Sequence, residues 1–277
     1  MRVLPRLVLL TALVATAAGC GARDEVTDPA SPYRPDDLVL RISYGGGLAA
    51  PDRLITNVPG FSLYGDGRVI ASGPVPAIYP GPALPNLQES HVGPFDPPLL
   101  AKRALDAGVG SADVGQPQIA DGGWTRFTVL TANGEKTTQV VELGYDEGLT
   151  RTQQAARAKL RTLLDDLTNL PAVQRSTPYQ ATEVAASAVP WTEPPDPSLP
   201  APPPIEWVGP GLPGPSVDNG PTPLAPCLVV TGEQASLVLG AAAKANTLTP
   251  WTSGGKQWRV GLRPLLPDEH SCADLTR

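Results

Sequence analysis

Residues 124–143, WTRFTVLTANGEKTTQVVEL, carry the pattern that decides the fold. Asn133-Gly134 is a pair that favours a tight turn between two antiparallel strands. The segments on either side are rich in β-branched and aromatic residues, which favour strands. We therefore predict a hairpin formed by residues 124–131 and 136–143.

Further strands are predicted nearer the amino terminus. Residues 38–44 alternate between apolar and polar side chains, the pattern of a half-buried strand. The apolar segments 61–64 and 68–70 flank Gly65-Asp66-Gly67, so a second hairpin is expected there. A proline-rich loop is predicted from Pro74 to Pro94.

Two helices complete this part of the chain. Asp96-Pro97 is a typical helix start, and Gly108 ends the apolar spacing that follows it. Thr150 and Gln153 form a capping box ahead of a leucine-lined helix. Residues 38–172 are therefore expected to form an α+β domain, with a mostly antiparallel sheet and two packed helices.

The carboxyl-terminal third is expected to be looser, and then to form a smaller unit. Residues 173–226 contain a strand candidate at residues 179–189 and then a proline-rich segment, in which residues 205–208 are predicted as a short edge strand. Residues 227–277 have the pattern of a β-α-β unit, with a capping box at Thr231. We predict that a disulfide between Cys227 and Cys272 closes this unit.

The amino terminus has the features of an export signal. Arg2 and Arg6 precede an apolar run that is too short to span a bilayer, and Ala17-Ala18-Gly19-Cys20 resembles the lipobox of bacterial lipoproteins. We predict a signal peptide over residues 1–19 and lipidation of Cys20. The alternative is an ordinary signal peptide, with Cys20 incidental.

The cysteine count favours lipidation. An exported protein with three cysteines has one unpaired thiol unless Cys20 is modified, and modification leaves Cys227 and Cys272 as a pair. Residues 20–37 contain prolines and acids without apolar periodicity and are expected to be a flexible tether. The chain is thus expected at the extracytoplasmic face of the cell membrane, attached by lipid alone.

Charge and motifs exclude several classes of function. The net charge is −6 and no basic stripe is present, so no nucleic-acid partner is expected. Only two histidines occur, His91 and His270, and neither belongs to a zinc motif. Asp66 is interpreted as a turn residue and not a calcium ligand, since a calcium loop needs several oxygen ligands. No catalytic residue, metal or other cofactor is predicted.

The segment Asp268-Glu269-His270-Ser271 combines acid, base and hydroxyl groups. Adjacent residues of a loop point in different directions, whereas a catalytic triad is assembled from distant positions. We expect a solvated terminal loop in which Glu269 or Asp268 pairs with Arg263. Gly45-Gly46-Gly47 lacks the pattern of a phosphate-binding loop and is interpreted as a strand end.

Tryptophans can stack on sugars. Single tryptophans that are far apart in the sequence, in strands and loops, are more typical of core residues or of contacts between domains. We expect that role for the five tryptophans, Trp124, Trp191, Trp207, Trp251 and Trp258.

Two resemblances bear on function. Residues 38–47, 61–70 and 263–269 resemble segments of uncharacterised actinobacterial lipoproteins, which implies no particular activity. A strand ending in Gly45-Gly46, a helix, an antiparallel pair and the leucine-lined helix of residues 160–167 also resemble emfourin. That similarity implies inhibition of thermolysin-like metalloproteases.

The sequence thus leaves three hypotheses. The first is a non-catalytic envelope lipoprotein that presents an α+β binding domain to an unknown extracytoplasmic partner or ligand. The second is a proteinaceous inhibitor of thermolysin-like metalloproteases. The third is an envelope hydrolase that uses carboxylates, for which two acids should face each other across a cleft.

Overall fold

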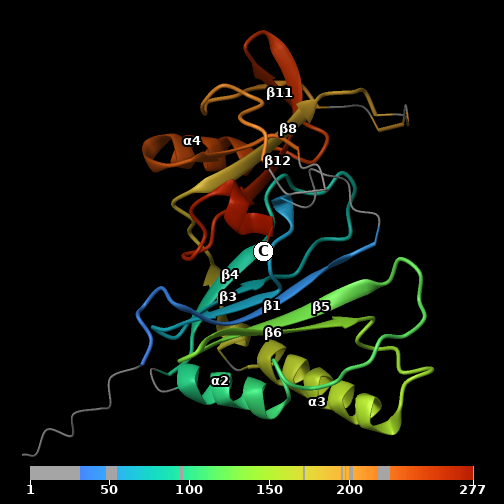
Figure 1. Cartoon of the computed structure of the whole chain (residues 1–277). Coiled ribbons are helices and arrows are strands. Elements are labelled where there is room, and N and C mark those ends of the chain that lie inside the picture. The colour runs from blue at the N-terminus through green and yellow to red at the C-terminus, as the bar shows by residue number, and fades with distance from the viewer. Residues whose placement is uncertain are drawn as a thin grey trace, which may run out of the picture. The chain divides into compact units, whose positions relative to one another are not determined.

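Two sheets and three α-helices make up the part of the chain that a computed structural model describes: residues 32–47, 55–93, 96–170, 172–194, 196, 198–199, 202–217 and 225–276 (Figure 1). Both sheets belong to one compact unit, Ser31–Arg277. The predicted signal peptide, Cys20 and the first part of the predicted tether lie outside the described residues. Lipidation of Cys20 therefore stays a prediction.

The larger sheet has seven strands in the order β6-β5-β1-β2-β3-β4-β7, and every neighbouring pair is antiparallel. Both predicted hairpins are present, as β2–β3 and β5–β6. The strands are β1 (Leu38–Gly46), β2 (Phe61–Tyr64), β3 (Arg68–Ser72), β4 (Leu87–His91), β5 (Gly123–Thr131), β6 (Gly134–Val141) and β7 (Thr177–Pro178).

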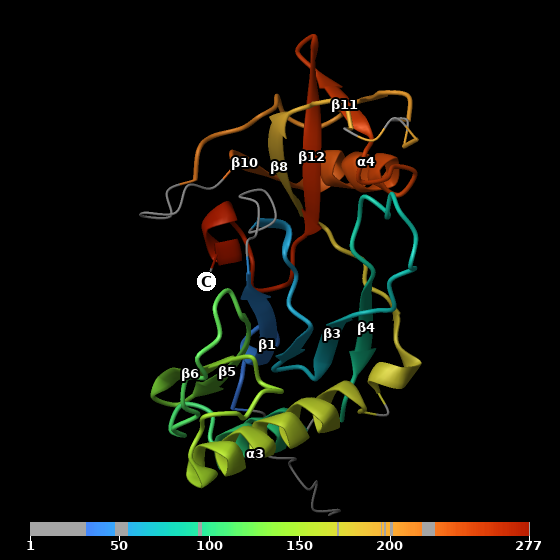
Figure 2. The same ribbon diagram turned by 90° about the vertical axis from the view of Figure 1, so that its right-hand side faces the viewer.

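Helices α2 (Asp96–Asp106) and α3 (Arg151–Thr168) cover one face of this sheet (Figures 1 and 2). The alternation along β1 places Leu40 and Ile42 on that face, where they pack with α3 residues such as Leu160. The predicted capping box forms, because Thr150 accepts from the backbone N–H of Gln153 and the Gln153 side chain accepts from that of Thr150. The opposite face of β1 stays polar.

The smaller sheet has five strands in the order β10-β8-β12-β11-β9, and its one parallel pair is β11–β9. Helix α4 (Gly232–Ala242) packs on it through Val238 and its neighbours. The short 3-10 helices are η1 (Val173–Arg175) and η2 (Cys272–Thr276). The strands are β8 (Val184–Pro190), β9 (Ile205–Glu206), β10 (Cys227–Val230), β11 (Pro250–Ser253) and β12 (Lys256–Pro264).

The predicted α+β class, with a mostly antiparallel sheet, packed helices and a disulfide near the carboxyl terminus, is confirmed. The carboxyl-terminal β-α-β unit is not self-contained, however. Strand β8, which is the strand candidate of residues 179–189, lies between β10 and β12 and pairs with both. The predicted edge strand at residues 205–208 is present as β9.

Three local predictions are wrong. The predicted loop from Pro74 to Pro94 contains strand β4, because β3 and β7 supply its hydrogen-bonding partners. Thr231 makes no side-chain cap at α4, where Gly232 follows it with a φ of 62°. Residues 33–37, expected in the tether, contact the β2–β3 turn through backbone bonds from Gly65 and Asp66.

Candidate functional site

A cleft of about 1340 Å³ opens on the polar face of the larger sheet. Its floor is the side of β1, β5 and β6 that faces away from α2 and α3. Residues paired across these strands share a face, which brings together hydroxyl, amide, guanidinium and indole groups. The floor residues are Arg41, Ser43, Gly45, Trp124, Arg126, Thr128, Glu135, Thr137 and Gln139.

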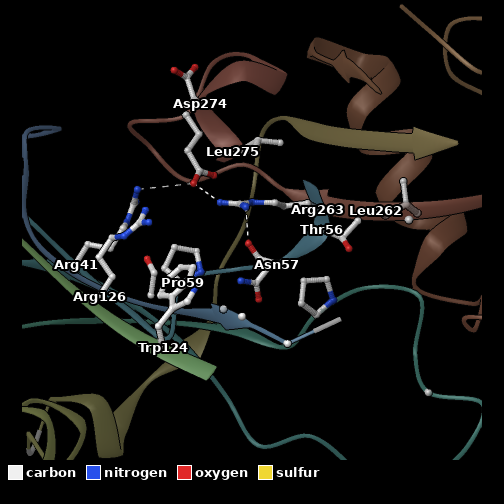
Figure 3. A pocket seen from close by; sticks show the side chains of 18 of the residues that line it. Arg41, Thr56, Asn57, Pro59, Trp124, Arg126, Leu262, Arg263, Asp274 and Leu275 are labelled. Carbon is white, nitrogen blue, oxygen red and sulfur yellow. Dashed lines mark hydrogen bonds and ion pairs between the residues drawn. The ribbon is translucent and has the colours of Figure 1, made fainter. Parts of the chain in front are cut away.

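The opposite wall comes from the smaller sheet and the carboxyl terminus. Strand β12 contributes residues 259–263 to this wall. The terminal segment contributes Asp274 and Leu275 (Figure 3). The proline-rich loop between β3 and β4 supplies an apolar rim that includes Ile78 and Tyr79, both largely exposed. The cleft therefore combines a polar floor with a partly apolar rim.

Trp124 is held flat against the floor. A Cβ at position 45 would lie 2.2 Å from Trp124 Cζ2, so only glycine allows the indole ring to lie over β1 here. The Arg126 guanidinium lies 4.5 Å from the Trp124 ring centroid and donates to Gln139 Oε1 at 2.8 Å. Gly45 was predicted only as part of a strand end. It lies within β1, and its lack of a side chain leaves the space that the Trp124 indole occupies.

Arg41 joins the sheet to the carboxyl-terminal segment. Its guanidinium donates to Ser62 Oγ at 3.1 Å and to Asp268 Oδ1 at 2.8 Å. Burial opposes its charge, but Asp268 and the other acidic groups outweigh burial, so the pKa of Arg41 is raised. Burial also raises the pKa of Tyr64 well above its usual value, so its phenol stays protonated and donates to Asp268 at 2.7 Å.

Arg263 and Glu269 form an ion pair inside the protein, where Arg263 is 3 % exposed and Glu269 is 2 % exposed. Glu269 Oε2 also accepts from the backbone N–H of Leu266 at 3.0 Å. Burial lowers the pKa of Arg263, and the charge of Glu269 opposes that shift. Arg263 donates further to the carbonyls of Ile55 and Asn57, as Figure 3 shows for Asn57.

The predicted pairing of Arg263 with Glu269 is therefore present, but the expectation of a solvated loop is wrong for Glu269. Leu265 and Leu266 are buried and anchor the segment, so the chain turns back over the protein. Tyr179 adds to this anchor by donating to the Leu265 carbonyl at 2.9 Å, and burial raises its pKa to about 12.

A disulfide between Cys227 and Cys272 fixes the same segment, with the Cα atoms 6.2 Å apart. It joins β10 to η2, as predicted. Leu275, three residues later, packs against Ile55 and Ala185 and also lines the cleft. One wall of the cleft is therefore crosslinked to the smaller sheet.

The other singled-out residues do not gather in the cleft. His91 is exposed on β4, and His270 is exposed in the terminal segment. Asp66 has the predicted turn role, because its carboxylate accepts from the backbone N–H of Arg68 at 2.9 Å. Of the tryptophans, Trp207, Trp251 and Trp258 are core residues of the smaller sheet, whereas Trp124 belongs to the cleft.

Three of the four carboxylates that line the cleft accept hydrogen bonds, and the fourth, Glu135, is exposed near the start of β6. Asp268 accepts from Arg41 and Tyr64, and Glu269 accepts from Arg263. Asp274 accepts from two backbone N–H groups and the Ser271 hydroxyl. A general acid or base needs a free carboxyl beside the reacting group, so this arrangement does not favour hydrolysis by paired acids.

Within the described ranges, no cluster of three or more histidine, cysteine or acidic residues is placed to hold a metal ion. Among the same residues, no helix is both long and apolar enough to cross a membrane. No protein-family model matches the chain, and no curated protein is significantly similar to it.

Proposed function

We propose that the chain is a non-catalytic cell-envelope lipoprotein that binds an extracytoplasmic partner or ligand in the cleft of the α+β unit. The cleft carries the proposal. Its volume of about 1340 Å³ exceeds the roughly 300–1,000 Å³ of pockets that enclose small molecules. Its floor presents hydroxyl, amide and guanidinium groups, which suits a segment of a polymer better than a small apolar compound.

The fixed geometry of the floor supports a binding role. Trp124 and Arg126 are stacked on each other, and Arg126 is oriented further by Gln139. The facing wall is held by the disulfide and by the buried Arg263–Glu269 pair. Preorganised groups lose little conformational entropy when a ligand binds.

A photo-crosslinker on the floor tests the binding proposal. With p-benzoylphenylalanine in place of Thr128, illumination of the native envelope should give a discrete crosslinked product that mass spectrometry can identify. The same group in place of Lys159, exposed on α3, is the matched control and should give none. No product at either position, or the same products at both, would refute binding in the cleft.

The proposed anchor has its own test. Cys20→Ser should move the protein from the membrane fraction to the soluble fraction and abolish its labelling by a fatty-acid analogue, because lipid on Cys20 is the proposed attachment. Cys272→Ser is the control and should leave both unchanged. A Cys20→Ser protein that still labels and still sediments with membranes would rule out the lipid anchor.

A further inference from the structure

Strand β6 forms one edge of the larger sheet, and its register shows which of its backbone groups are unpaired. The Glu142 N–H donates to the Gly123 carbonyl at 2.7 Å, at the end of the β5–β6 ladder. Hydrogen-bonded and non-hydrogen-bonded pairs alternate along an antiparallel ladder. The residues whose backbone groups point away from β5 are therefore Glu135, Thr137, Gln139 and Val141.

The protein itself closes one end of this edge. The Arg157 guanidinium donates to the carbonyl of Val141 at 2.8 Å and also to that of Glu142. Among the residues that the structure describes, nothing bonds the outward N–H and C=O groups of Glu135, Thr137 and Gln139. They form a row of unsatisfied donors and acceptors with the two-residue spacing of a strand.

The same three residues send their side chains onto the floor of the cleft. A strand added beside β6 would continue the sheet, and every second side chain of that strand would point to the cleft side. Backbone pairing and side-chain contact are thus available to one ligand at one place. Only another extended polypeptide presents donors and acceptors at this spacing.

We infer that the cleft binds an extended polypeptide segment that adds to the sheet along β6, between Glu135 and Gln139. This rests on the binding function proposed above and specifies its ligand class. The paired segment is about 17 Å long, with backbone hydrogen bonds supplying affinity and the cleft selecting alternate side chains.

A second copy of the chain fits this edge less well. Pairing of two such short edges buries far less than the roughly 1,200 Å² typical of a stable complex. A peptide that pairs with the edge can also place every second side chain in the cleft, whose floor there is lined by Glu135, Thr137 and Gln139. The peptide is therefore the occupant that the geometry favours.

The test uses a linear dodecapeptide library displayed on phage, selected on the purified full-length protein. The best peptide is then labelled and its affinity measured by fluorescence anisotropy. Thr137→Pro removes an outward N–H but no bond of the β5–β6 ladder, since proline is tolerated where the N–H of an edge strand faces solvent. We expect it to weaken binding by about five- to tenfold, the effect of roughly one lost hydrogen bond.

Lys159→Ala is the control, because Lys159 is exposed on α3, outside the cleft, and this variant should bind within about twofold of the unmodified protein. Circular dichroism and thermal melting check that Thr137→Pro folds. If it does not, the peptide is modified instead. N-methylation at alternate residues should abolish binding in one register and spare it in the other.

The remaining outcomes separate the two proposals. Binding that is lost on filling the cleft with Thr128→Trp, yet is indifferent to Thr137→Pro and to N-methylation, would overturn the added strand and leave a binding cleft. A dimer that becomes a monomer in Thr137→Pro would overturn the peptide in favour of a second copy. A library that yields no binder would also overturn the inference, while crosslinking at Thr128 would still decide on the cleft.

Discussion

Replacement of Glu269 by glutamine should lower the free energy of unfolding by about 3–5 kcal/mol, because it removes the carboxylate that forms an ion pair with the buried guanidinium of Arg263. Arg263 is only 3 % exposed, so water cannot replace the lost carboxylate. The hydrogen bond from the Leu266 N–H to Glu269 Oε2 can persist with the amide oxygen of glutamine, which isolates the effect of charge. Urea unfolding followed by tryptophan fluorescence measures the change.

Glu193→Gln is the matched control, because Glu193 is exposed and the same substitution there should change stability by less than about 0.5 kcal/mol. Arg263→Met combined with Glu269→Leu should recover much of the loss, since removal of both charges leaves no unpaired ion. A cost below about 1 kcal/mol for Glu269→Gln would mean that the pair is far more hydrated than its burial indicates.

Local signals explain which elements could be predicted from the sequence. Asn133-Gly134 specifies a turn, and Thr150 with Gln153 specifies a helix start, through interactions within a few residues. Strand β4 was missed because its sequence, LQESH, is mostly polar. It becomes a strand only because β3 and β7 lie on either side of it.

Strand order could not be predicted in the same way. A strand near residues 179–189 was expected, but nothing local indicates that β8 separates β10 from β12. The same limit applies to the edge position of β6. Its hairpin was predicted, yet the unpaired backbone groups become visible only when β5 is seen to have β1 on its other side.

The separation of two residues along the chain also explains which ion pairs at the cleft could be predicted from the sequence. Arg263 and Glu269 are six residues apart, and their pairing was among the expectations. Arg41 and Asp268 are 227 residues apart, so no spacing rule connects them. Arg41 stands on the polar face of an alternating strand, where a charge is ordinary, so its local sequence gives no sign that its guanidinium is enclosed with Tyr64 and Asp268.

Loss of the disulfide is expected to loosen the terminal wall of the cleft and to reduce stability by roughly 4 kcal/mol, the chain-entropy value for a crosslink between residues 45 apart. The effect should be local at first. Leu275 and Cys272 pack in a small cluster with Ile55 and Ala185, whereas the large core beneath α3 has no residue from this segment. Hydrogen exchange of the reduced protein should therefore show early loss of protection in residues 265–276 and unchanged protection in β5.

Two forms of the protein distinguish the effect of losing the disulfide bond from the effect of losing the cysteine side chains. Reduction of the unmodified protein keeps both sulfurs in place, while Cys227→Ala with Cys272→Ala also removes packing volume at a site where Cys227 is 1 % exposed. Both should expose the terminal segment, and the double variant should lose somewhat more stability. If residues 265–276 and β5 lost protection together, the terminal segment would unfold only with the whole protein. The expectation that it opens first would then be wrong.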